Sequence, residues 1–304
     1  MTVLTVDRPS RPAAGDAAVV GAITAAQPAR VAGVTIATET PSRDQLRAHL
    51  VSSRIAGDIA TPRDNNLTNY RRMSDREPLY LFGLEPDGAW TPPDVLALMA
   101  NRCGVSADPG HTRGRDTIDP DRTLDRLDAL ADRLRIAADR RERVLVATGH
   151  PVGLRPTHTA IARGLRAAGC TLVDAARGWR HPKDPAFSNQ TGTIGYLDGI
   201  AVLNGSGGGA EHTHSPLPMR AILAELAATG VAPPDLVVAD HGWAGAAGQA
   251  GIDTVGFADS NDPALFVGEA EGRILVCVPL DDNVAPQLYA PMTAYLLGRA
   301  GLVR

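Results

Sequence analysis

A chain of 304 residues is long enough for one large domain, or two modest ones, with a full hydrophobic core. Hydrophobic residues make up 44% and charged residues 21%, which is the profile of an ordinary globular protein. The net charge of −4 is too small to indicate a nucleic-acid-binding protein or a polybasic membrane anchor. Because neither a membrane-spanning apolar run nor a signal-peptide pattern is visible, we expect a cytoplasmic protein.

Two rare residue types narrow the chemistry further. Lys183 is the only lysine among 30 basic residues, and no GxxxxGK[ST] string occurs. Schiff-base chemistry needs a lysine amine, so pyridoxal phosphate enzymes and P-loop nucleoside triphosphatases are disfavoured. Cys103, Cys170 and Cys277 lie far apart without zinc-ligand spacing, which fits a reducing compartment. Cys170 and Cys277 lie in apolar stretches, so we expect these two to be buried small hydrophobic residues.

The first half of the chain predicts a leader and a helical region. Residues 1–41, rich in Ala, Pro and Thr, predict a mostly disordered leader with room for one short strand at Val31–Ile36. Residues 42–142 predict a helical region that packs on the core. Its helices are expected from Arg43 (capped by Ser42), from Pro92, and over 121–140, with a polar segment at 61–70 between the first two.

From residue 143 to 304 short apolar runs alternate with helical stretches. The runs are β-branched and apolar throughout, which is typical of strands buried on both faces of a parallel sheet. We expect strands at 144–148, 171–175, 199–204, 235–240, 254–259 and 273–279, and helices at 156–168, 216–229, 263–271 and 287–299. This alternation predicts an α/β fold with a doubly wound, mostly parallel, Rossmann-like sheet.

Polar residues follow most of these strands directly. In open α/β sheets ligands bind at the carboxyl ends of the strands, so we expect the active site at this edge. The residues that follow the strands are Gly149-His150, Asn204 with Gly205-Ser206-Gly207, Asp240-His241, Asp259 with Asn261-Asp262, and Asp281-Asp282-Asn283.

Three aspartates are the expected metal ligands. Carboxylates suit Mg²⁺ or Mn²⁺, and carboxylates from neighbouring strand ends can share one cation, so we assign Asp240, Asp259 and Asp262 to such a site. Asp262 precedes Pro263 and could instead be a helix N-cap. Asp281 and Asp282 are more typical of a solvated turn.

Histidines and glycines are the expected phosphate-binding and proton-transfer groups. His150, His214 and His241 are candidate acids or bases, and His212 shares a face with His214, so this pair could bind either a metal or a phosphate. Gly149 and the loop of Gly205, Ser206 and Gly207 could present backbone N–H groups to phosphate, although no dinucleotide fingerprint is present.

A second set of candidates could contact the substrate. It contains Asn204, Asn261, Trp243, and a polar cluster of Arg63, Asn65, Asn66 and Tyr70. Arg63 could clamp a phosphate, although an ordinary loop explains the cluster equally well. Trp243 could stack on a base or sugar, or form a wall of the site.

The segment from Ser42 to Leu302 resembles an actinobacterial family labelled simply "phosphatase". The strings that carry the resemblance are RIAGD at 54–58, TPRDNN at 61–66, ATGHP at 147–151, HTHS at 212–215, VADHGWAG at 238–245 and ADSNDP at 258–263. The resemblance implies a phosphatase activity and covers most of the chain outside the leader.

These observations favour a metal-assisted phosphomonoesterase that acts on a small phosphorylated metabolite, such as a sugar phosphate or a nucleoside monophosphate. No DxDx[TV] string appears, which disfavours an aspartyl-phosphate intermediate. A sugar-phosphate isomerase, lyase or dehydratase that uses the same phosphate loops is the alternative, and a non-catalytic ligand-binding module is a third. We expect no nucleic-acid or membrane partner, and the sequence leaves a homo-oligomer open.

Overall fold

The computed structural model describes residues 40–303. The possible strand Val31–Ile36 and nearly all of the predicted leader lie outside the described residues. Within residues 40–303 the predicted α/β fold is confirmed, with a five-stranded parallel sheet at its centre. In spatial order the strands are β10 (Val276–Pro279), β9 (Thr254–Ala258), β8 (Leu236–Asp240), β3 (Arg143–Val146) and β4 (Thr171–Leu172).

The strand order reverses between β3 and β8. From β3 the chain crosses through α6 (Arg155–Ala167) to β4 on one side of the sheet. From β8 it crosses through α8 (His241–Gln249) and α9 (Pro263–Ala270) to β9 and β10 on the other side. A reversal of this kind opens a crevice at the carboxyl ends of the two central strands. The loops after β3 and β8 therefore meet at the natural ligand-binding position of the fold.

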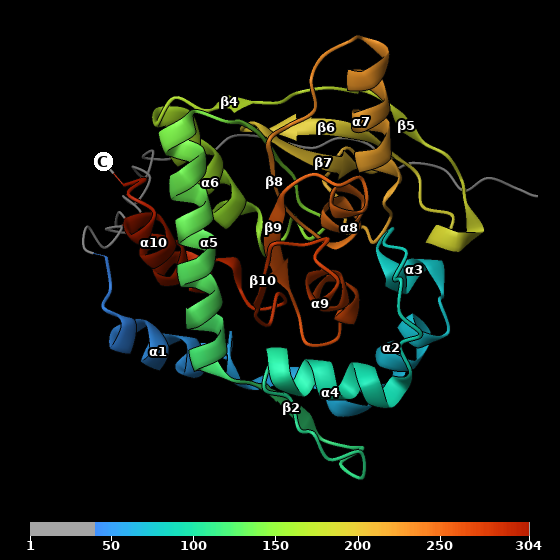
Figure 1. Ribbon diagram of the computed structural model, residues 1–304, viewed down its shortest axis with the longest axis vertical. Helices are drawn as coiled ribbons and strands as arrows, with labels where there is room; N and C mark the ends of the chain where they lie inside the picture. Colours follow the sequence, from blue (N-terminus) through green and yellow to red (C-terminus); the bar gives the residue numbers. More distant parts are fainter. Residues whose placement is uncertain (1–39, 304) are drawn as a thin grey trace, which may run out of the picture. The chain divides into compact units, whose positions relative to one another are not determined.

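Helices cover both faces of the sheet (Figure 1). Alternate side chains such as Val144 and Val238 face α6, α5 (Pro120–Arg140), α10 (Ala290–Arg299) and α1 (Arg43–Ser52). Their neighbours Leu145 and Val237 face the opposite core, which includes α8 and α9. Because both faces are buried, these strands carry apolar residues at every position instead of alternating.

One predicted strand does not belong to the parallel sheet. β7 (Ile200–Asn204) pairs antiparallel with β6 (Gly192–Leu197), which in turn pairs with β5 (Arg180–His181). The turn between β6 and β7 is Asp198-Gly199, and both residues have positive φ, as a tight two-residue hairpin requires. This hairpin gives residues 199–204 an antiparallel partner, while a single parallel bridge from Ala201 to Ala147 keeps β7 beside β3.

The region before β3 contains a hairpin as well as helices. β1 (Gly57–Pro62) pairs antiparallel with β2 (Arg115–Ile118), and the helices are α1, α2 (Arg63–Ser74), α3 (Pro78–Leu81), α4 (Pro92–Arg102) and α5. The Ser42 cap of α1 is confirmed as a capping box. The polar segment at 61–70, by contrast, forms the end of β1 and the first turns of α2. It lacks an apolar stripe because its buried positions include Arg63, Asn66 and Asn69.

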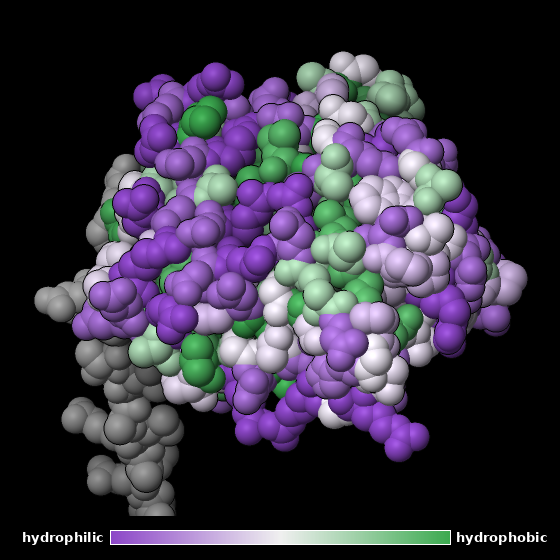
Figure 2. Space-filling model, turned by 60° about the horizontal axis from the view of Figure 1, so that its bottom comes forward, coloured by the Kyte–Doolittle hydropathy of each residue, from purple (hydrophilic) through white to green (hydrophobic). Residues whose placement is uncertain are grey.

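The remaining elements are the 3₁₀ turns η1 (Pro185–Phe187) and η2 (Pro286–Tyr289), and α7 (Leu217–Ala228). All three cysteines are buried free thiols, which confirms the burial predicted for Cys170 and Cys277. The face in Figure 2 is largely hydrophilic with interspersed hydrophobic residues, and few large hydrophobic side chains are exposed within the described residues. None of the helices of residues 40–303 is both long and apolar enough to cross a membrane.

Candidate active site

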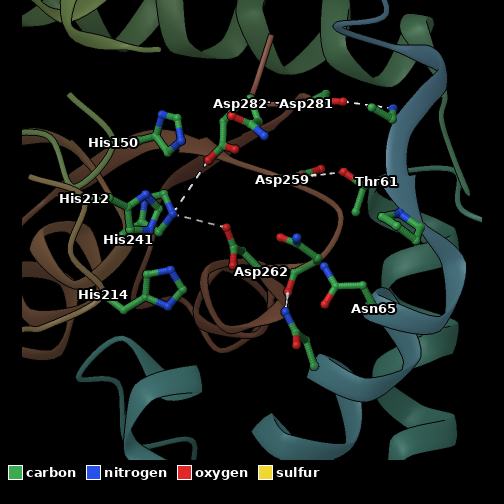
Figure 3. A pocket seen from close by; sticks show the side chains of 15 residues that line it. Thr61, Asn65, His150, His212, His214, His241, Asp259, Asp262, Asp281 and Asp282 are labelled. Atoms are coloured by element: carbon green, nitrogen blue, oxygen red, sulfur yellow. Dashed lines mark hydrogen bonds and ion pairs between the residues drawn. The ribbon is translucent and has the colours of Figure 1, made fainter. Parts of the chain in front are cut away.

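A cavity of about 430 Å³ lies at the carboxyl ends of the central strands. Its walls come from the loops after β3, β8, β9 and β10, from residues 212–214, and from the end of β1 and the start of α2. Figure 3 shows four imidazoles on one side, Thr61 and Asn65 on the other, and aspartates between them. The fifteen residues that line it are Ala60, Thr61, Pro62, Asn65, Asn69, His150, His212, His214, His241, Asp259, Asn261, Asp262, Asp281, Asp282 and Asn283.

His241 lies at the centre of this cavity, directly after β8. Its backbone is left-handed, with φ of 48°, a conformation that non-glycine residues adopt mainly where the surroundings enforce it. Its Nδ1 donates a 2.8 Å hydrogen bond to Asp240, and its Nε2 lies 3.4 Å from Asp262 and 3.6 Å from Asp282. Burial alone would lower the pKa of His241, but Asp240, Asp262 and Asp282 together raise it to about 10.

Asp240 supports His241 from behind the cavity rather than lining it. One carboxylate oxygen accepts hydrogen bonds from His241 Nδ1 and from the backbone N–H groups of Gly149 (2.6 Å) and His150 (3.1 Å). The other accepts one from Thr148 Oγ1 at 2.6 Å. Asp240 is fully buried. The sequence predicted it as a direct metal ligand, but its oxygens are occupied by these donors and do not reach the cavity.

Two glycines let residues 212–215 pass close to the strand ends. A Cβ on Gly149 would lie 2.5 Å from the carbonyl oxygen of Thr213, and one on Gly242 would lie 2.3 Å from that of His214. Gly149 therefore serves close packing, and its N–H group binds Asp240 instead of phosphate. The close approach brings the imidazoles of His212 and His214 to within 5.0 Å of the His241 ring, centroid to centroid.

Three overlapping sets of side chains have donor atoms close enough to hold a metal ion. They are His212 with His214 and His241; His241 with Asp262 and Asp282; and Asp259 with Asp281 and Asp282. Within each set the donor atoms lie within 4.8 Å of one another. Because His241 and Asp282 each belong to two sets, the three positions are adjacent and span the cavity.

Two further observations fit cation binding. Nδ1 of His214, a member of the first set, is buried and has no hydrogen-bond partner among the described residues. Burial raises the pKa of Asp262 to about 7, and burial and neighbouring aspartates raise the pKa values of Asp259 and Asp282. Carboxyl groups that crowd together in this way are relieved by a shared cation.

The aspartates are fixed by backbone and hydroxyl donors. Asp281 accepts a hydrogen bond from the N–H of Ala60 at 3.1 Å, and Asp259 accepts one from Thr61 Oγ1 at 2.7 Å. Asp262 makes no capping hydrogen bond to α9, so the helix-cap alternative is not realised by its side chain. Its carboxylate instead faces His241.

Helix α2 holds the loop after β9 in place. The Asn69 amide donates to the carbonyl oxygen of Asn261 at 2.9 Å, and the Tyr70 hydroxyl donates to that of Ser260 at 2.7 Å. Asn66 donates to Asp116 at 2.9 Å and lies 3.2 Å from Ser260 Oγ, away from the cavity. Of the predicted polar cluster, only Asn65 lines the cavity.

Arg63 does not clamp a phosphate in this structure. Its guanidinium is fully buried and forms a 2.7 Å ion pair with Asp116. Its other nitrogens donate to the carbonyl oxygens of His111 (2.8 Å) and Asp108 (3.1 Å). All three nitrogens are therefore bound within the protein, which makes Arg63 a structural residue.

The glycine-rich loop and Trp243 also lie outside this cavity. β7 belongs to the antiparallel sheet, and Gly205, Ser206 and Gly207 of the loop that follows it do not line the active-site cavity. The predicted Asn204, and Gly208 and Gly209 of the same loop, line a separate cavity. That second cavity, of about 460 Å³, is lined by Pro151, Val152, Arg155, Leu197, Asn204, Gly208, Gly209 and Ala210. Trp243 belongs to α8, and its side chain is fully buried in the core and forms no wall of the site.

Sequence reasoning undervalued Asp281 and Asp282. Both are buried, at 1% and 6% exposure, and both line the cavity, whereas a solvated turn had been the expectation. Their position after β10 was the available signal, since it is the one that singled out Asp259 after β9. Thr61 and Asn69 belong to the same polar segment as the predicted Asn65 but were not proposed, because the segment has no periodicity that indicates which of its side chains face a cavity.

Comparison with known proteins places the chain in a family. Residues 41–304 match the model of the family described as "Phosphatase". The chain is 51% identical over 265 residues to "Phosphatase SCO2771" of Streptomyces coelicolor, an alignment that covers 86% of this chain and 98% of that protein. The resemblance seen in the sequence motifs is thereby confirmed, and the chain belongs to this Phosphatase family.

Proposed function

We propose that this protein is a metal-dependent phosphatase that hydrolyses monoesters of small phosphorylated metabolites. The observation that carries the proposal is the composition of the cavity: four aspartates and four histidines line it, and none of the lysine and arginine side chains in residues 40–303 does. The family match and the name of the Streptomyces relative support a phosphatase activity.

The charge of the cavity is the physical reason for a metal. A phosphate monoester carries negative charge, and carboxylates at Asp259, Asp262, Asp281 and Asp282 would repel it. No guanidinium or ammonium group of residues 40–303 lines the cavity, and one protonated His241 cannot offset four carboxyl groups, so a bound divalent cation would reverse this charge. A bound divalent cation would polarise the phosphoryl group and activate water.

The donor types favour Mn²⁺ over Mg²⁺ at the histidine-rich end. His212, His214 and His241 offer nitrogen ligands, which Mn²⁺ and Zn²⁺ accept more readily than Mg²⁺ does. The set of Asp259, Asp281 and Asp282 offers only oxygen and suits Mg²⁺ or Mn²⁺. Asp240 would hold the His241 ring in the orientation for metal binding, because its carboxylate accepts the hydrogen bond from Nδ1 and leaves Nε2 facing the cavity.

His150 is the best candidate for the general acid. It is the cavity imidazole that belongs to none of the three donor sets, so its nitrogen stays available when metals occupy them. Its ring lies 4.9 Å from that of His212 and 6.0 Å from that of His241, centroid to centroid. It would donate a proton to the leaving alcohol oxygen, while the amides of Asn65 and Asn261 could donate to phosphate oxygens.

The test is phosphate release from a panel of sugar phosphates and nucleoside monophosphates. The protein is stripped with a chelator, its metal content is measured, and Mn²⁺, Zn²⁺ or Mg²⁺ is then restored. We expect no turnover without metal and recovery that is best with Mn²⁺. Full activity in verified metal-free protein would refute the metal, and a phosphorylated product formed without phosphate release would instead indicate an isomerase, lyase or dehydratase.

A further inference from the structure

A further cavity, distinct from the one beside the glycine-rich loop, opens beside the histidine side of the active site. It has a volume of about 410 Å³ and shares His212 and His214 with the first cavity. Its other lining residues are Leu79 of α3, Phe187 of η1, and Ser188, Gln190 and Thr213. We call it the side cavity. A molecule whose phosphate lies among the candidate metal ligands could therefore extend past these two imidazoles into the side cavity.

The side cavity differs in chemistry from the active-site cavity. Leu79 and Phe187 give it apolar walls, and none of its lining residues is Asp, Glu, Lys or Arg. Phe187 is itself mostly buried, at 8% exposure, so its ring is held in place by its surroundings. An uncharged cavity with an aromatic wall suits the organic part of a substrate, since apolar groups gain free energy there by leaving water.

Gln190 fixes the side cavity relative to the active site. Its Nε2 donates to the carbonyl oxygen of His212 at 2.7 Å, and its Oε1 accepts from Thr213 Oγ1 at 2.5 Å. Both halves of the amide are thus bound to the run that carries His212 and His214. The segment with Phe187 is thereby tied to the candidate metal ligands, which sets the distance between an organic group and a phosphate.

The cavity beside the glycine-rich loop is the competing location. It is lined by Arg155, Asn204 and exposed Val152 among others, and it has no lining residue in common with the active-site cavity. Because the glycine-loop cavity and the active-site cavity have no common lining residue, a single small substrate would not occupy both of them. Only the side cavity continues directly from the candidate metal ligands.

We propose that the side cavity binds the alcohol portion of the substrate, and that this portion carries an aromatic or other flat apolar group, such as an aryl ring or a nucleobase. The proposal rests on the proposed phosphatase function. It narrows the substrate class, because a short polyol phosphate would leave Leu79 and Phe187 without contacts. It also makes Phe187 a specificity-determining residue.

The experiment compares two esters in the metal-loaded protein: p-nitrophenyl phosphate, which has an aromatic group, and glycerol 3-phosphate, which has none. For Phe187→Ala we expect KM for the aryl ester to rise about tenfold or more, which is the usual effect of removing an apolar pocket wall. KM for glycerol 3-phosphate and the inhibition constant of inorganic phosphate should stay within about twofold of the wild type. Leu79→Ala, at a half-buried position, repeats the test should Phe187→Ala fail to fold.

Val152→Ala is the matched control, since it removes an exposed apolar side chain from the glycine-loop cavity. Unchanged aryl-ester KM in folded Phe187→Ala and Leu79→Ala would overturn the inference, as would a rise in Val152→Ala alone. If the wild-type protein releases phosphate from neither ester nor from the wider panel, the proposed function itself fails. Turnover by the wild-type protein therefore distinguishes failure of the proposed phosphatase function from failure of the side-cavity inference.

Discussion

Replacing Asp240 by asparagine separates orientation of a metal ligand from metal binding itself. Asparagine keeps the shape of the side chain and one carbonyl oxygen, so it can still accept hydrogen bonds from Gly149, His150 and His241. In the wild-type protein Thr148 Oγ1 donates to Asp240, and in the variant the asparagine amide would donate to Thr148 Oγ1. We therefore expect Asp240→Asn to fold.

The loss falls on His241. Without the negative charge behind it, Nδ1 forms a weaker hydrogen bond and Nε2 becomes a poorer metal ligand. Substitutions of a carboxylate that hydrogen-bonds to a metal-binding histidine cost about 10–100-fold in metal affinity, or roughly 1.4–2.7 kcal/mol. The pKa of His241 should also fall, since the Asp240 hydrogen bond is the largest of the effects that raise it.

Calorimetric titration of stripped protein with Mn²⁺ measures the effect, and circular dichroism checks the fold. Asp198→Asn is the control, because Asp198 is an exposed carboxylate whose partner is Arg163 on the surface. Wild-type Mn²⁺ affinity in folded Asp240→Asn would refute the reasoning that Asp240 acts through His241.

Three further predictions follow from the same contacts. The pKa of His241 is about 10 when folded against an ordinary 6.5, so its protonation stabilises the metal-free fold fully below pH 6.5, and this contribution is lost as pH rises towards 10. The melting temperature measured in a chelator should thus fall between pH 7 and pH 9, and it should fall less when Mn²⁺ is present. An equal dependence of melting temperature on pH in the two conditions would contradict the replacement of the His241 proton by a cation. Arg63→Met leaves Asp116 buried without its partner and should cost about 3–5 kcal/mol of unfolding free energy in urea titration, where a change under about 1 kcal/mol would argue against a structural role. His150→Gln should lower kcat about 10²–10⁴-fold at unchanged metal content; loss of metal would make it a ligand instead of the acid.

The parallel sheet and its reactive edge were predictable because they depend on local patterns. Continuous apolar runs mark strands buried on both faces, and the polar residues after them mark the edge where ligands bind. That logic located His150, His241, Asp259 and Asp262 in one cavity. It applied equally to Asp282, where the resemblance to an ordinary turn prevailed.

The parts that could not be predicted depend on contacts between distant segments. Arg63 and Asp116 are 53 residues apart, and nothing near either one shows that they pair inside the protein. Helix α2 escaped notice because its buried face is polar, so it has no apolar periodicity. The antiparallel pairing of β7 with β6 is different, because it is a local contact and the Asp198-Gly199 turn was an available signal for it.

Anomalous diffraction from crystals of the protein grown with Mn²⁺ tests the metal centre most directly. We expect a peak within coordination distance of His241 Nε2, between the imidazoles of His212 and His214 and the carboxylates of Asp262 and Asp282. A cavity without any anomalous peak, in crystals that contain Mn²⁺ at saturating concentration, would contradict the account.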